Sequence, residues 1–224
     1  MIQVKDLEKE FSDFTLFKDV SFEINQGEFV GLVGHSGIGK STLLYMISGL
    51  KESDAGQIII NNHKIHTMSP QELLVLRHNN FGFIFQENYL INYLKVRENI
   101  LLPVKKFSPE IEERMMELAH FFGISHQLDK FPGELSVGQK QRVSIARALI
   151  NAPHILFADE PTASLDDENS EKVISLLKQL NQKEDLTIFM VSHDKRQWQY
   201  FDRIIELKDK TAVEIRVEDD EYHG

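Results

Sequence analysis

The fold of this 224-residue chain is decided by one stretch, Gly34-His35-Ser36-Gly37-Ile38-Gly39-Lys40-Ser41-Thr42. It directly follows an apolar run, residues 29–33, which is typical of a buried strand. Its glycines allow a tight turn whose backbone N–H groups converge on an anion, and a helix beginning near Lys40 adds the positive end of its dipole. Lys40 can reach the β- and γ-phosphates of a nucleoside triphosphate, while the Ser41 hydroxyl can bind Mg²⁺. We call residues 34–42 the phosphate loop.

The charge balance narrows the range of partners. The chain has 25 Lys and Arg against 35 Asp and Glu, for a formal net charge of −10. This balance argues against a nucleic-acid partner bound through a broad basic surface, and against electrostatic docking on anionic lipid. There is no cysteine, which excludes disulfides, thiolate metal sites and cysteine nucleophiles.

The N-terminus gives evidence on location. Residues 1–6 (Met-Ile-Gln-Val-Lys-Asp) carry charge where a signal peptide needs an apolar stretch. No segment approaches the ~20 apolar residues that span a bilayer. We therefore expect a cytoplasmic chain, and any action on a membrane requires a separate partner. Near the other end, Glu218-Asp219-Asp220-Glu221 predicts a solvated acidic tail.

The order of the expected elements indicates an α/β fold. Strands are expected at residues 2–7, 16–24, 29–33, 57–60, 81–85, 154–158, 187–191 and 203–207, and helices at 40–48, 109–122, 139–150 and 167–181, with turns at 25–27 and 54–56. Strands that alternate with helices predict a mostly parallel sheet flanked by helices. We interpret residues 1–224 as one domain, with a helical lobe inserted at roughly 87–140.

A second motif ends the apolar run at 154–158 with two adjacent carboxylates, Asp159 and Glu160. A buried strand beside the phosphate loop brings both to the carboxyl edge of the sheet, where open α/β folds bind ligands. Because strand side chains alternate in direction, Asp159 can face Mg²⁺ while Glu160 polarises a water that attacks the γ-phosphate. The structural alternative is a pair of solvated acids or a helix cap.

A third motif, Ser136-Val137-Gly138-Gln139, opens the helix expected at 139–150. Ser136 is a candidate N-cap, and together with Gly138 it offers a second anion-binding helix start. One nucleotide does not need two such sites. The second anion-binding site is explained if this helix start closes on the γ-phosphate of an ATP held by another copy of the chain. The alternative is that Ser136 only caps its helix.

With these motifs in this order, the chain resembles the nucleotide-binding subunit of an ATP-binding cassette (ABC) transporter over essentially its whole length. The resemblance implies a P-loop NTPase domain of the ABC type, with an N-terminal antiparallel β region, that hydrolyses ATP with Mg²⁺. It implies a homodimer in which each ATP lies between the phosphate loop of one copy and Ser136, Gly138 and Gln139 of the other. It also implies an integral-membrane permease as partner, with this chain peripheral on the inner face of the cell membrane.

Three further positions take their roles from the same resemblance. Gln86, after the strand expected at 81–85, resembles the glutamine that contacts Mg²⁺ and the attacking water and links to the permease. Asp166, in Ser164-Leu165-Asp166, resembles a loop residue that crosses the dimer interface, although acids here also favour a helix start. His193 resembles the histidine that holds the γ-phosphate.

Two positions depart from the family pattern. Residues 136–139 resemble the family's signature motif. That motif usually has glycine where Val137 stands, and a β-branched residue resists positive φ, so this loop must adopt an ordinary conformation or bear strain. The adenine-stacking residue is usually tyrosine. Phe11 is the candidate here, with Phe14 and Phe17 as rivals and core packing as the alternative for each.

Residues 83–90 and 96–103 resemble the branch of the family that serves lipoprotein release, macrolide export, antimicrobial-peptide resistance and haem efflux. The resemblance therefore implies an export or efflux system whose substrate is set by the permease. A soluble ABC ATPase that is not coupled to transport is the alternative. The third possible function is that of a regulator that binds a nucleotide without hydrolysing it. This function is disfavoured by the presence of Asp159, Glu160 and His193.

Overall fold

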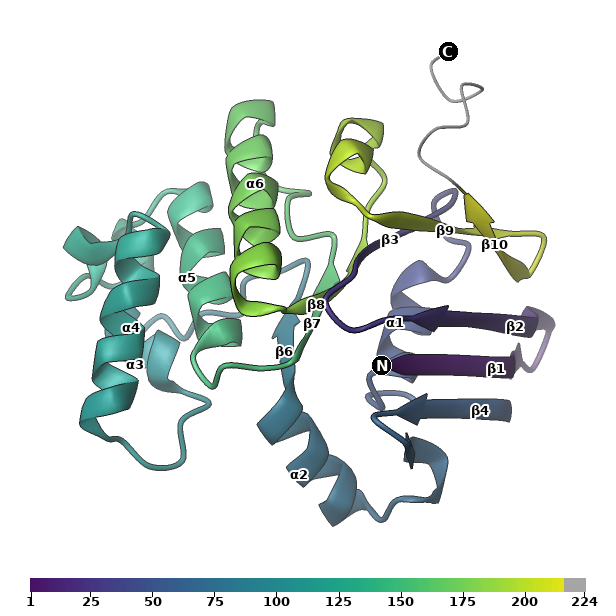
Figure 1. Cartoon of the computed structure of the whole chain (residues 1–224). Helices are drawn as coiled ribbons and strands as arrows, with labels where there is room; N and C mark the ends of the chain where they lie inside the picture. Colours follow the sequence, from purple (N-terminus) through teal and green to yellow (C-terminus); the bar gives the residue numbers. More distant parts are fainter. Residues whose placement is uncertain (216–224) are drawn as a thin grey trace.

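The computed structural model describes residues 1–215, so the acidic stretch at 218–221 lies outside the described residues (Figure 1). Within this range the strands form two sheets. The smaller sheet is antiparallel, in the order β2-β1-β4-β5. The larger has the order β10-β9-β3-β8-β7-β6 and is parallel except for β10 at its edge. The mostly parallel sheet with an antiparallel N-terminal region, predicted from the sequence, is confirmed.

The strands are β1 (Ile2–Phe11), β2 (Phe14–Ile24), β3 (Phe29–Val33), β4 (Ala55–Ile60), β5 (His63–Lys64), β6 (Phe81–Ile84), β7 (Ile155–Asp159), β8 (Thr187–Val191), β9 (Arg203–Lys208) and β10 (Thr211–Ile215). The α-helices are α1 (Lys40–Ile47), α2 (Pro70–Asn80), α3 (Val96–Leu101), α4 (Pro109–Phe121), α5 (Val137–Leu149) and α6 (Asp167–Glu184). Short 3₁₀ turns are η1 (Ile65–Thr67), η2 (Ser125–Gln127), η3 (Pro132–Glu134) and η4 (Lys195–Tyr200).

The larger sheet is buried on both faces because its central strands alternate between two cores. Along β3, Phe29 and Val33 pack into the core formed with α3, α4, α5 and α6. Val30 and Leu32 of the same strand pack against α1 and the antiparallel sheet. β7 and β8 divide their side chains in the same way. A continuous apolar run such as residues 29–33 is what a strand covered on both faces requires.

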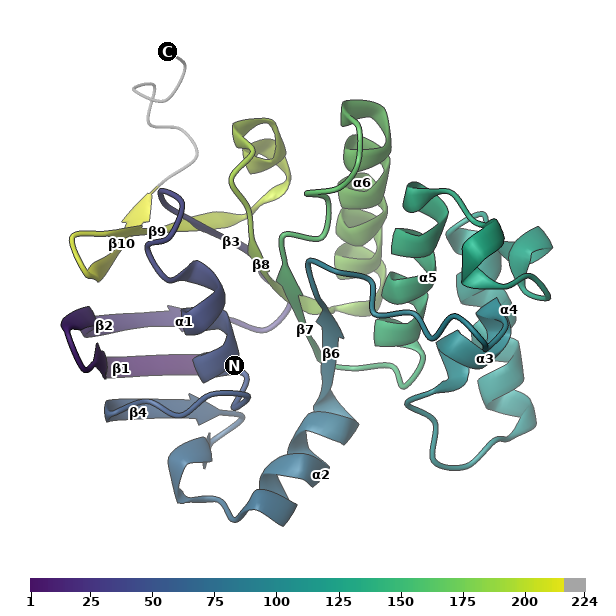
Figure 2. The same ribbon diagram turned by 180° about the vertical axis from the view of Figure 1, so that it is seen from behind.

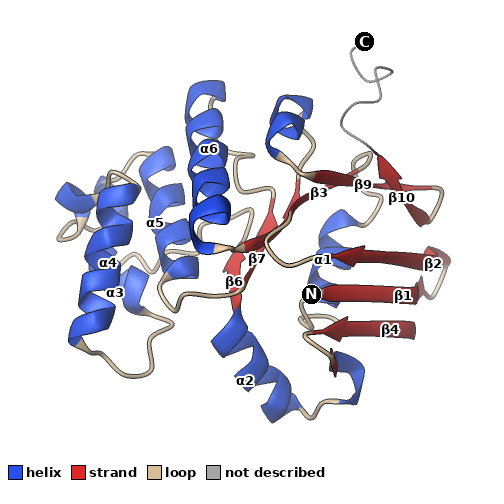
Figure 3. Cartoon of the chain, in the orientation of Figure 1, coloured by secondary structure: helices blue, strands red, loops and turns tan. Residues whose placement is uncertain are grey.

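Most of the helices gather toward two ends of the molecule, and α2 lies below β6 in Figure 1. α1 lies beside the antiparallel sheet, while α3, α4 and α5 stand together at the opposite end, with α6 between them and the strands (Figure 1, Figure 2). Figure 3 shows the same division as a strand-rich half and a helical half. Among residues 1–215, no helix is long and apolar enough to cross a membrane.

The sequence analysis did not predict several elements, among them α2, α3 and β10. The reason is clearest for α2, which buries only Leu76 and so carries no apolar period. Its start is nevertheless encoded by Ser69, which forms a reciprocal cap with Glu72, and by Pro70 in the first turn. The turn expected at 54–56 was wrong in part, because β4 begins at Ala55.

Candidate active site

The carboxyl ends of four neighbouring parallel strands carry the predicted site residues. The phosphate loop follows β3, and His193 follows β8. Asp159 and Glu160 stand at the end of β7, and Gln86 lies just past β6. These strands are adjacent in the order β3-β8-β7-β6, so one edge of the sheet gathers residues from distant parts of the chain. This is the edge at which open α/β sheets bind ligands.

The backbone of the phosphate loop requires glycine at three positions, of which Gly37 has φ 78°. Gly34 has φ 145° and Gly39 has φ 105°, a region that other residues rarely adopt. A side chain would also collide, because a Cβ at Gly34 would lie 2.7 Å from the Leu207 carbonyl oxygen and one at Gly39 would lie 2.8 Å from Phe17 Cζ. The loop is thus held against β9 and β2, and its tip, residues 35–37, is exposed.

The buried side chains of Lys40 and Ile38 anchor the phosphate loop to the protein. The Lys40 side chain is buried, and its Nζ donates to the carbonyl oxygens of Gly34 at 3.0 Å and His35 at 3.1 Å. Its charge therefore lies against the loop that would cradle the phosphates of a nucleotide. Ile38 packs into the core beneath, so only its backbone can face a nucleotide.

Asp159 is held by two hydrogen bonds from α1. It is 3 % exposed, its Oδ1 accepts from the Ser41 hydroxyl at 2.8 Å, and its Oδ2 accepts from the Tyr45 hydroxyl at 2.7 Å. Burial and the hydrogen bond to Asp159 raise the pKa of Tyr45 above its ordinary value, so the phenol stays protonated and acts as a donor. Tyr45 was not predicted, because in the sequence it is one more large side chain within an apolar helix.

Ser41 and Asp159 offer the ligands that Mg²⁺ prefers. This ion is usually held by one or two carboxylates together with waters and substrate phosphates. The Ser41 hydroxyl donates its hydrogen to Asp159, which leaves its lone pairs free for a cation. The two residues therefore fit a Mg²⁺ ion that arrives with a nucleotide. The ion would neutralise charge on the phosphates.

Glu160 differs from Asp159 in backbone and exposure. Its φ is 46°, a left-handed conformation that costs on the order of 1–3 kcal/mol for a residue other than glycine. Glu160 Oε2 lies 3.5 Å from Nδ1 of His193, and the His193 ring is well exposed. The two side chains therefore lie together, with His193 exposed and Glu160 partly buried, in a position to orient a water.

A buried network of hydrogen bonds holds the loops that follow β7 and β8. The Gln197 amide, on η4, donates to the hydroxyls of Thr162 at 2.8 Å and Ser170 at 3.1 Å. Its oxygen accepts from the Ser192 hydroxyl at 2.8 Å. All four residues are buried, and together they join the end of β8, the turn after β7 and the start of α6. No sequence pattern indicates this network, because a single glutamine in a 3₁₀ turn follows no periodicity.

An ion-pair cluster at the surface ties the same loops together. Arg196 donates from Nε and Nη2 to the Asp194 carboxylate at 2.9 and 2.8 Å, and its Nη1 lies 2.5 Å from Asp167 Oδ2. These bonds hold the pKa of both carboxyls below the ordinary value. Asp166 caps α6 by accepting from the Asn169 N–H at 2.9 Å. Its part in starting a helix is confirmed, and its part in a dimer interface stays a prediction.

α5 begins with the predicted cap. Ser136 Oγ accepts from the Gln139 N–H at 3.3 Å, and Gln139 Oε1 accepts from the Ser136 N–H at 2.9 Å. Val137 is 50 % exposed and does not have a positive φ, so it adopts the ordinary conformation and bears no such strain. A Cβ on Gly138 would meet Asn169 only at an ordinary contact distance of 3.5 Å. The fold of one chain therefore does not require glycine at 138.

Within one chain the phosphate loop and the start of α5 are not brought together. α1, which begins at the loop, and α5 lie on opposite sides of β7 and β8 in both views (Figure 1, Figure 2). The structure thus assembles residues 34–42, 159–160 and 193 at one edge of the sheet. It leaves residues 136–139 apart from them.

The segment after Gln86 is fastened to α5. Gln86 itself is exposed. Arg147, on α5, donates from Nη1 to the Tyr89 carbonyl oxygen at 2.7 Å and from Nη2 to the Asn88 carbonyl oxygen at 2.6 Å. Burial lowers the pKa of Arg147 from its ordinary value. A displacement of this segment would therefore pull on the helix that carries the signature motif.

The three phenylalanines considered for adenine stacking differ in exposure. Phe11 and Phe14 are 42 % and 56 % exposed, and their rings stack on each other with centroids 5.4 Å apart. Phe17 is fully buried. A buried ring has no free face for a base, so Phe17 is excluded and Phe11 and Phe14 remain candidates.

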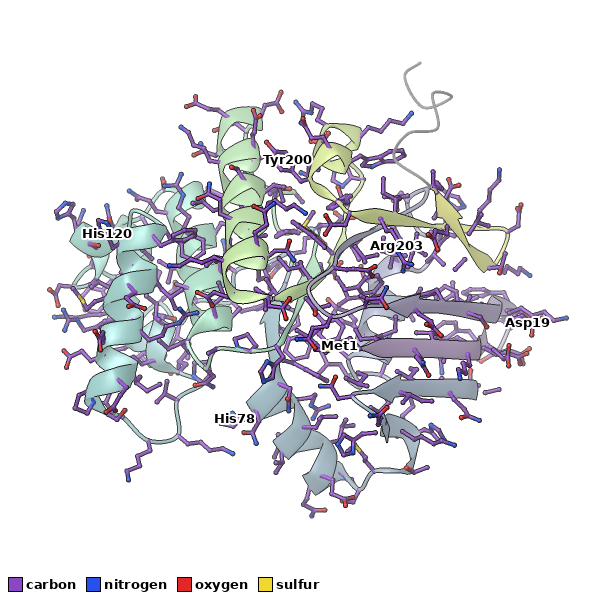
Figure 4. The ribbon with its side chains drawn as sticks, viewed as in Figure 1. Met1, Asp19, His78, His120, Tyr200 and Arg203 are labelled. Atoms are coloured by element: carbon purple, nitrogen blue, oxygen red, sulfur yellow. The ribbon has the colours of Figure 1, made fainter. Side chains whose placement is uncertain are left out.

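A groove of about 820 Å³ opens beside β6 and α2. Its lining combines aromatic rings with cations, namely Tyr45, Phe81, Phe83, Phe85 and Tyr89 with Lys51, Arg77 and Arg147. His78, which Figure 4 labels on α2, also lines the groove, and burial and the charge of Lys105 hold the pKa of His78 below its ordinary value. In the part of the chain that the structure describes, no acidic side chain lines the groove, although acids outnumber bases in the whole chain.

Comparisons with known proteins agree with this geometry. The family model described as ABC transporter matches residues 17–163. The chain is 42 % identical to the putative hemin import ATP-binding protein HrtA of Staphylococcus saprophyticus, over 93 % of this chain and 96 % of that protein. It is 38 % identical to the lipoprotein-releasing system ATP-binding protein LolD of Bacteroides thetaiotaomicron, over 94 % of this chain and 98 % of that protein. A solved dimer of the ATP-binding cassette MJ0796, in a post-hydrolysis state bound to ADP and Pi, has a TM-score of 0.86 at 36 % identity and covers 96 % of this chain and 99 % of its own.

Proposed function

Because the chain belongs to the ABC transporter family, we propose that it drives a separate membrane permease of the export type by ATP-dependent closure of a homodimer. As a member of the family, the chain is a transporter ATPase that binds ATP. The observation that carries the proposal is the separation of the phosphate loop from the start of α5 within one chain. Two copies facing each other would bring each loop to the other copy's Ser136 and Gly138.

ATP is bound by the phosphate loop, whose backbone N–H groups and Lys40 hold the phosphates. Ser41 and Asp159 would hold a Mg²⁺ ion, which would neutralise charge on the phosphates. The partner copy adds the start of its α5, where unpaired N–H groups of the first turn favour an anion. The dimeric cassette bound to ADP and Pi supports this arrangement by structural likeness.

Hydrolysis is carried by Glu160 and His193. Glu160 orients a water and accepts a proton from it as the water oxygen attacks the γ-phosphorus, and the bond from that phosphorus to the bridging oxygen of ADP breaks, with ADP as the leaving group. His193 steadies the γ-phosphate. Departure of phosphate removes the charge that holds the two copies together, so the dimer opens. The 3.5 Å approach of the Glu160 and His193 side chains supports this division of roles.

The groove beside β6 is the docking site of the permease. Its aromatic rings offer apolar surface, and among residues 1–215 its lining includes cations and no acidic side chain. A short segment of the permease with apolar and acidic side chains complements such a groove. The groove adjoins the Gln86 segment, which Arg147 fastens to α5. Docking can therefore influence the helix that completes the partner's ATP site.

The export direction rests on residues 83–90 and 96–103 and on the likeness to a lipoprotein-releasing ATP-binding protein. A relative of similar identity carries the word import in its name. Direction is therefore tested by reconstituting the chain with its permease in proteoliposomes. Movement of cargo away from the side that holds the ATPase supports export, and movement toward it contradicts export.

Coupling to a permease is tested by affinity purification from detergent-solubilised membranes of the native cell. Leu74 lines the groove and is 59 % exposed, so Leu74→Arg blocks the groove with little effect on folding. Val213→Arg, on β10 with Val213 48 % exposed, is the matched control. We expect the unsubstituted chain and Val213→Arg to recover an integral-membrane protein, and Leu74→Arg to recover at least tenfold less while keeping the circular dichroism spectrum and melting temperature of the unsubstituted chain. Recovery of no membrane protein by any of the three supports the soluble alternative.

A further inference from the structure

Tyr45 belongs both to the groove and to the nucleotide site. Its ring lines the groove, with its centroid 6.3 Å from that of Phe85. Phe85 in turn packs edge-on against Tyr89, at 5.7 Å, and the Tyr89 ring is exposed in the same groove. The Tyr45 hydroxyl donates to Asp159 Oδ2 at 2.7 Å. Contacts between neighbouring side chains thus run from the exposed Tyr89 ring to the carboxylate.

We propose that Tyr45 is a positioning residue that orients the Asp159 carboxylate for Mg²⁺ and transmits occupancy of the groove to it. The first half of this inference rests on the hydrogen bond between Tyr45 and Asp159. The second half rests on the proposed function, because it takes the groove to be the permease docking site.

The orientation of Asp159 depends on few contacts. Each of its oxygens accepts one hydrogen bond, from Ser41 and from Tyr45, and the residue is almost fully buried. The Ser41 hydroxyl has a second task, because its lone pairs face a cation when Mg²⁺ is bound. The Tyr45 hydroxyl has no such task. It is therefore the donor that fixes the plane of the carboxylate.

The position of the Tyr45 hydroxyl depends on its ring. The rigid phenol places the oxygen at the end of a flat side chain, so a tilt of the ring against Phe85 moves the hydroxyl relative to Asp159. Hydrogen bonds weaken steeply as their angle departs from linear. A side chain that enters the groove and shifts the ring would change how Asp159 is held. This route runs through α1 and is separate from the Gln86 segment.

The positioning role is tested with Tyr45→Phe, which keeps the ring and removes the hydroxyl. In a Glu160→Gln background, which suppresses hydrolysis, calorimetry measures ATP binding with Mg²⁺ and with EDTA. We expect affinity in Mg²⁺ to fall about tenfold, the effect of one hydrogen bond to a charged group, and affinity in EDTA to stay unchanged. Tyr89→Phe, in the same groove, is the matched control and should change neither value. Unchanged affinity in Mg²⁺, or an equal loss in EDTA, overturns the positioning role.

Transmission is tested by filling the groove. The chain has no cysteine, so Leu74→Cys can be labelled uniquely with a bulky maleimide, and Val213→Cys serves as the labelled control. We expect the Leu74→Cys label to change ATP affinity in Mg²⁺ at least threefold when Tyr45 is present and to have no effect when combined with Tyr45→Phe. A label effect of equal size in both backgrounds, or none in either, overturns transmission. These affinities do not depend on recovery of a membrane protein, so the inference and the proposed function can fail separately.

Discussion

The phosphate loop and the start of α5 both place glycine at the beginning of a helix. They differ in whether the fold of a single chain requires that glycine. At the loop, Gly34 and Gly39 are required by positive φ and by close neighbours, and Lys40 is buried against carbonyl oxygens. At the start of α5, Val137 is half exposed and Gly138 would accept a Cβ without a clash. The loop is complete within its own chain. The start of α5 is better explained by what approaches it from outside.

Hydrolysis should show the strongest change, and it tests the catalytic group next to the phosphate loop. Glu160→Gln removes the base that orients water, so turnover should fall at least a hundredfold, within the usual range for general base catalysis. ATP affinity should stay within about twofold, because the binding groups are intact. Size-exclusion chromatography with light scattering should show a stable dimer in MgATP. Glu87→Gln is the control, and near-normal turnover of Glu160→Gln contradicts the assignment of the base.

The next effect is on nucleotide binding. Lys40→Ala removes the cation held against the loop, and we expect ATP affinity to fall by about a hundredfold, since hydrogen bonds to charged groups are each worth ~1.5–3 kcal/mol. Calorimetry measures this, with circular dichroism to confirm that the chain folds. Lys51→Ala, outside the loop, should bind ATP normally. Equal affinities for the two variants would refute the role of the loop.

Gly138→Ala tests whether a partner approaches the start of α5. Because a Cβ is accommodated and alanine favours a helix, we expect the melting temperature to stay the same or rise. Turnover should fall about tenfold, because the added methyl group keeps the partner's γ-phosphate away from the backbone. Gly133→Ala is the matched control, since a Cβ there has nothing within 4 Å. Unchanged turnover of Gly138→Ala would mean that nothing approaches this helix start.

The smallest effect is expected from Val137→Gly, which restores the usual family residue. Val137 is half exposed in an ordinary conformation, so its loss should cost no more than about 0.5 kcal/mol through helix propensity alone. Chemical denaturation measures the change in the free energy of unfolding. Turnover should stay within about twofold. A severalfold rise would show that Val137 restrains the approach of the partner's nucleotide.

The sequence predicted those features that depend on neighbours along the chain. The phosphate loop, Asp159 and Glu160 are contiguous motifs at strand ends, and apolar runs such as residues 29–33 marked the buried strands. Tyr45 and Gln197 were missed because their roles depend on partners that are close only after folding. The sequence does not distinguish Phe17 from the other adenine-stacking candidates, because its burial also depends on the folded structure. Its burial follows from the face of β2 on which it lies.

A mixing experiment shows whether each ATP is shared between two copies of the chain. One chain carries Lys40→Ala with an intact signature, and the other carries Ser136→Arg with an intact phosphate loop. Each alone should be inactive. In a mixed dimer, the intact phosphate loop of one copy meets the intact signature of the other, so we expect mixing to restore ATP hydrolysis well above the sum of the two parents. Activity that stays at that sum would contradict the shared site.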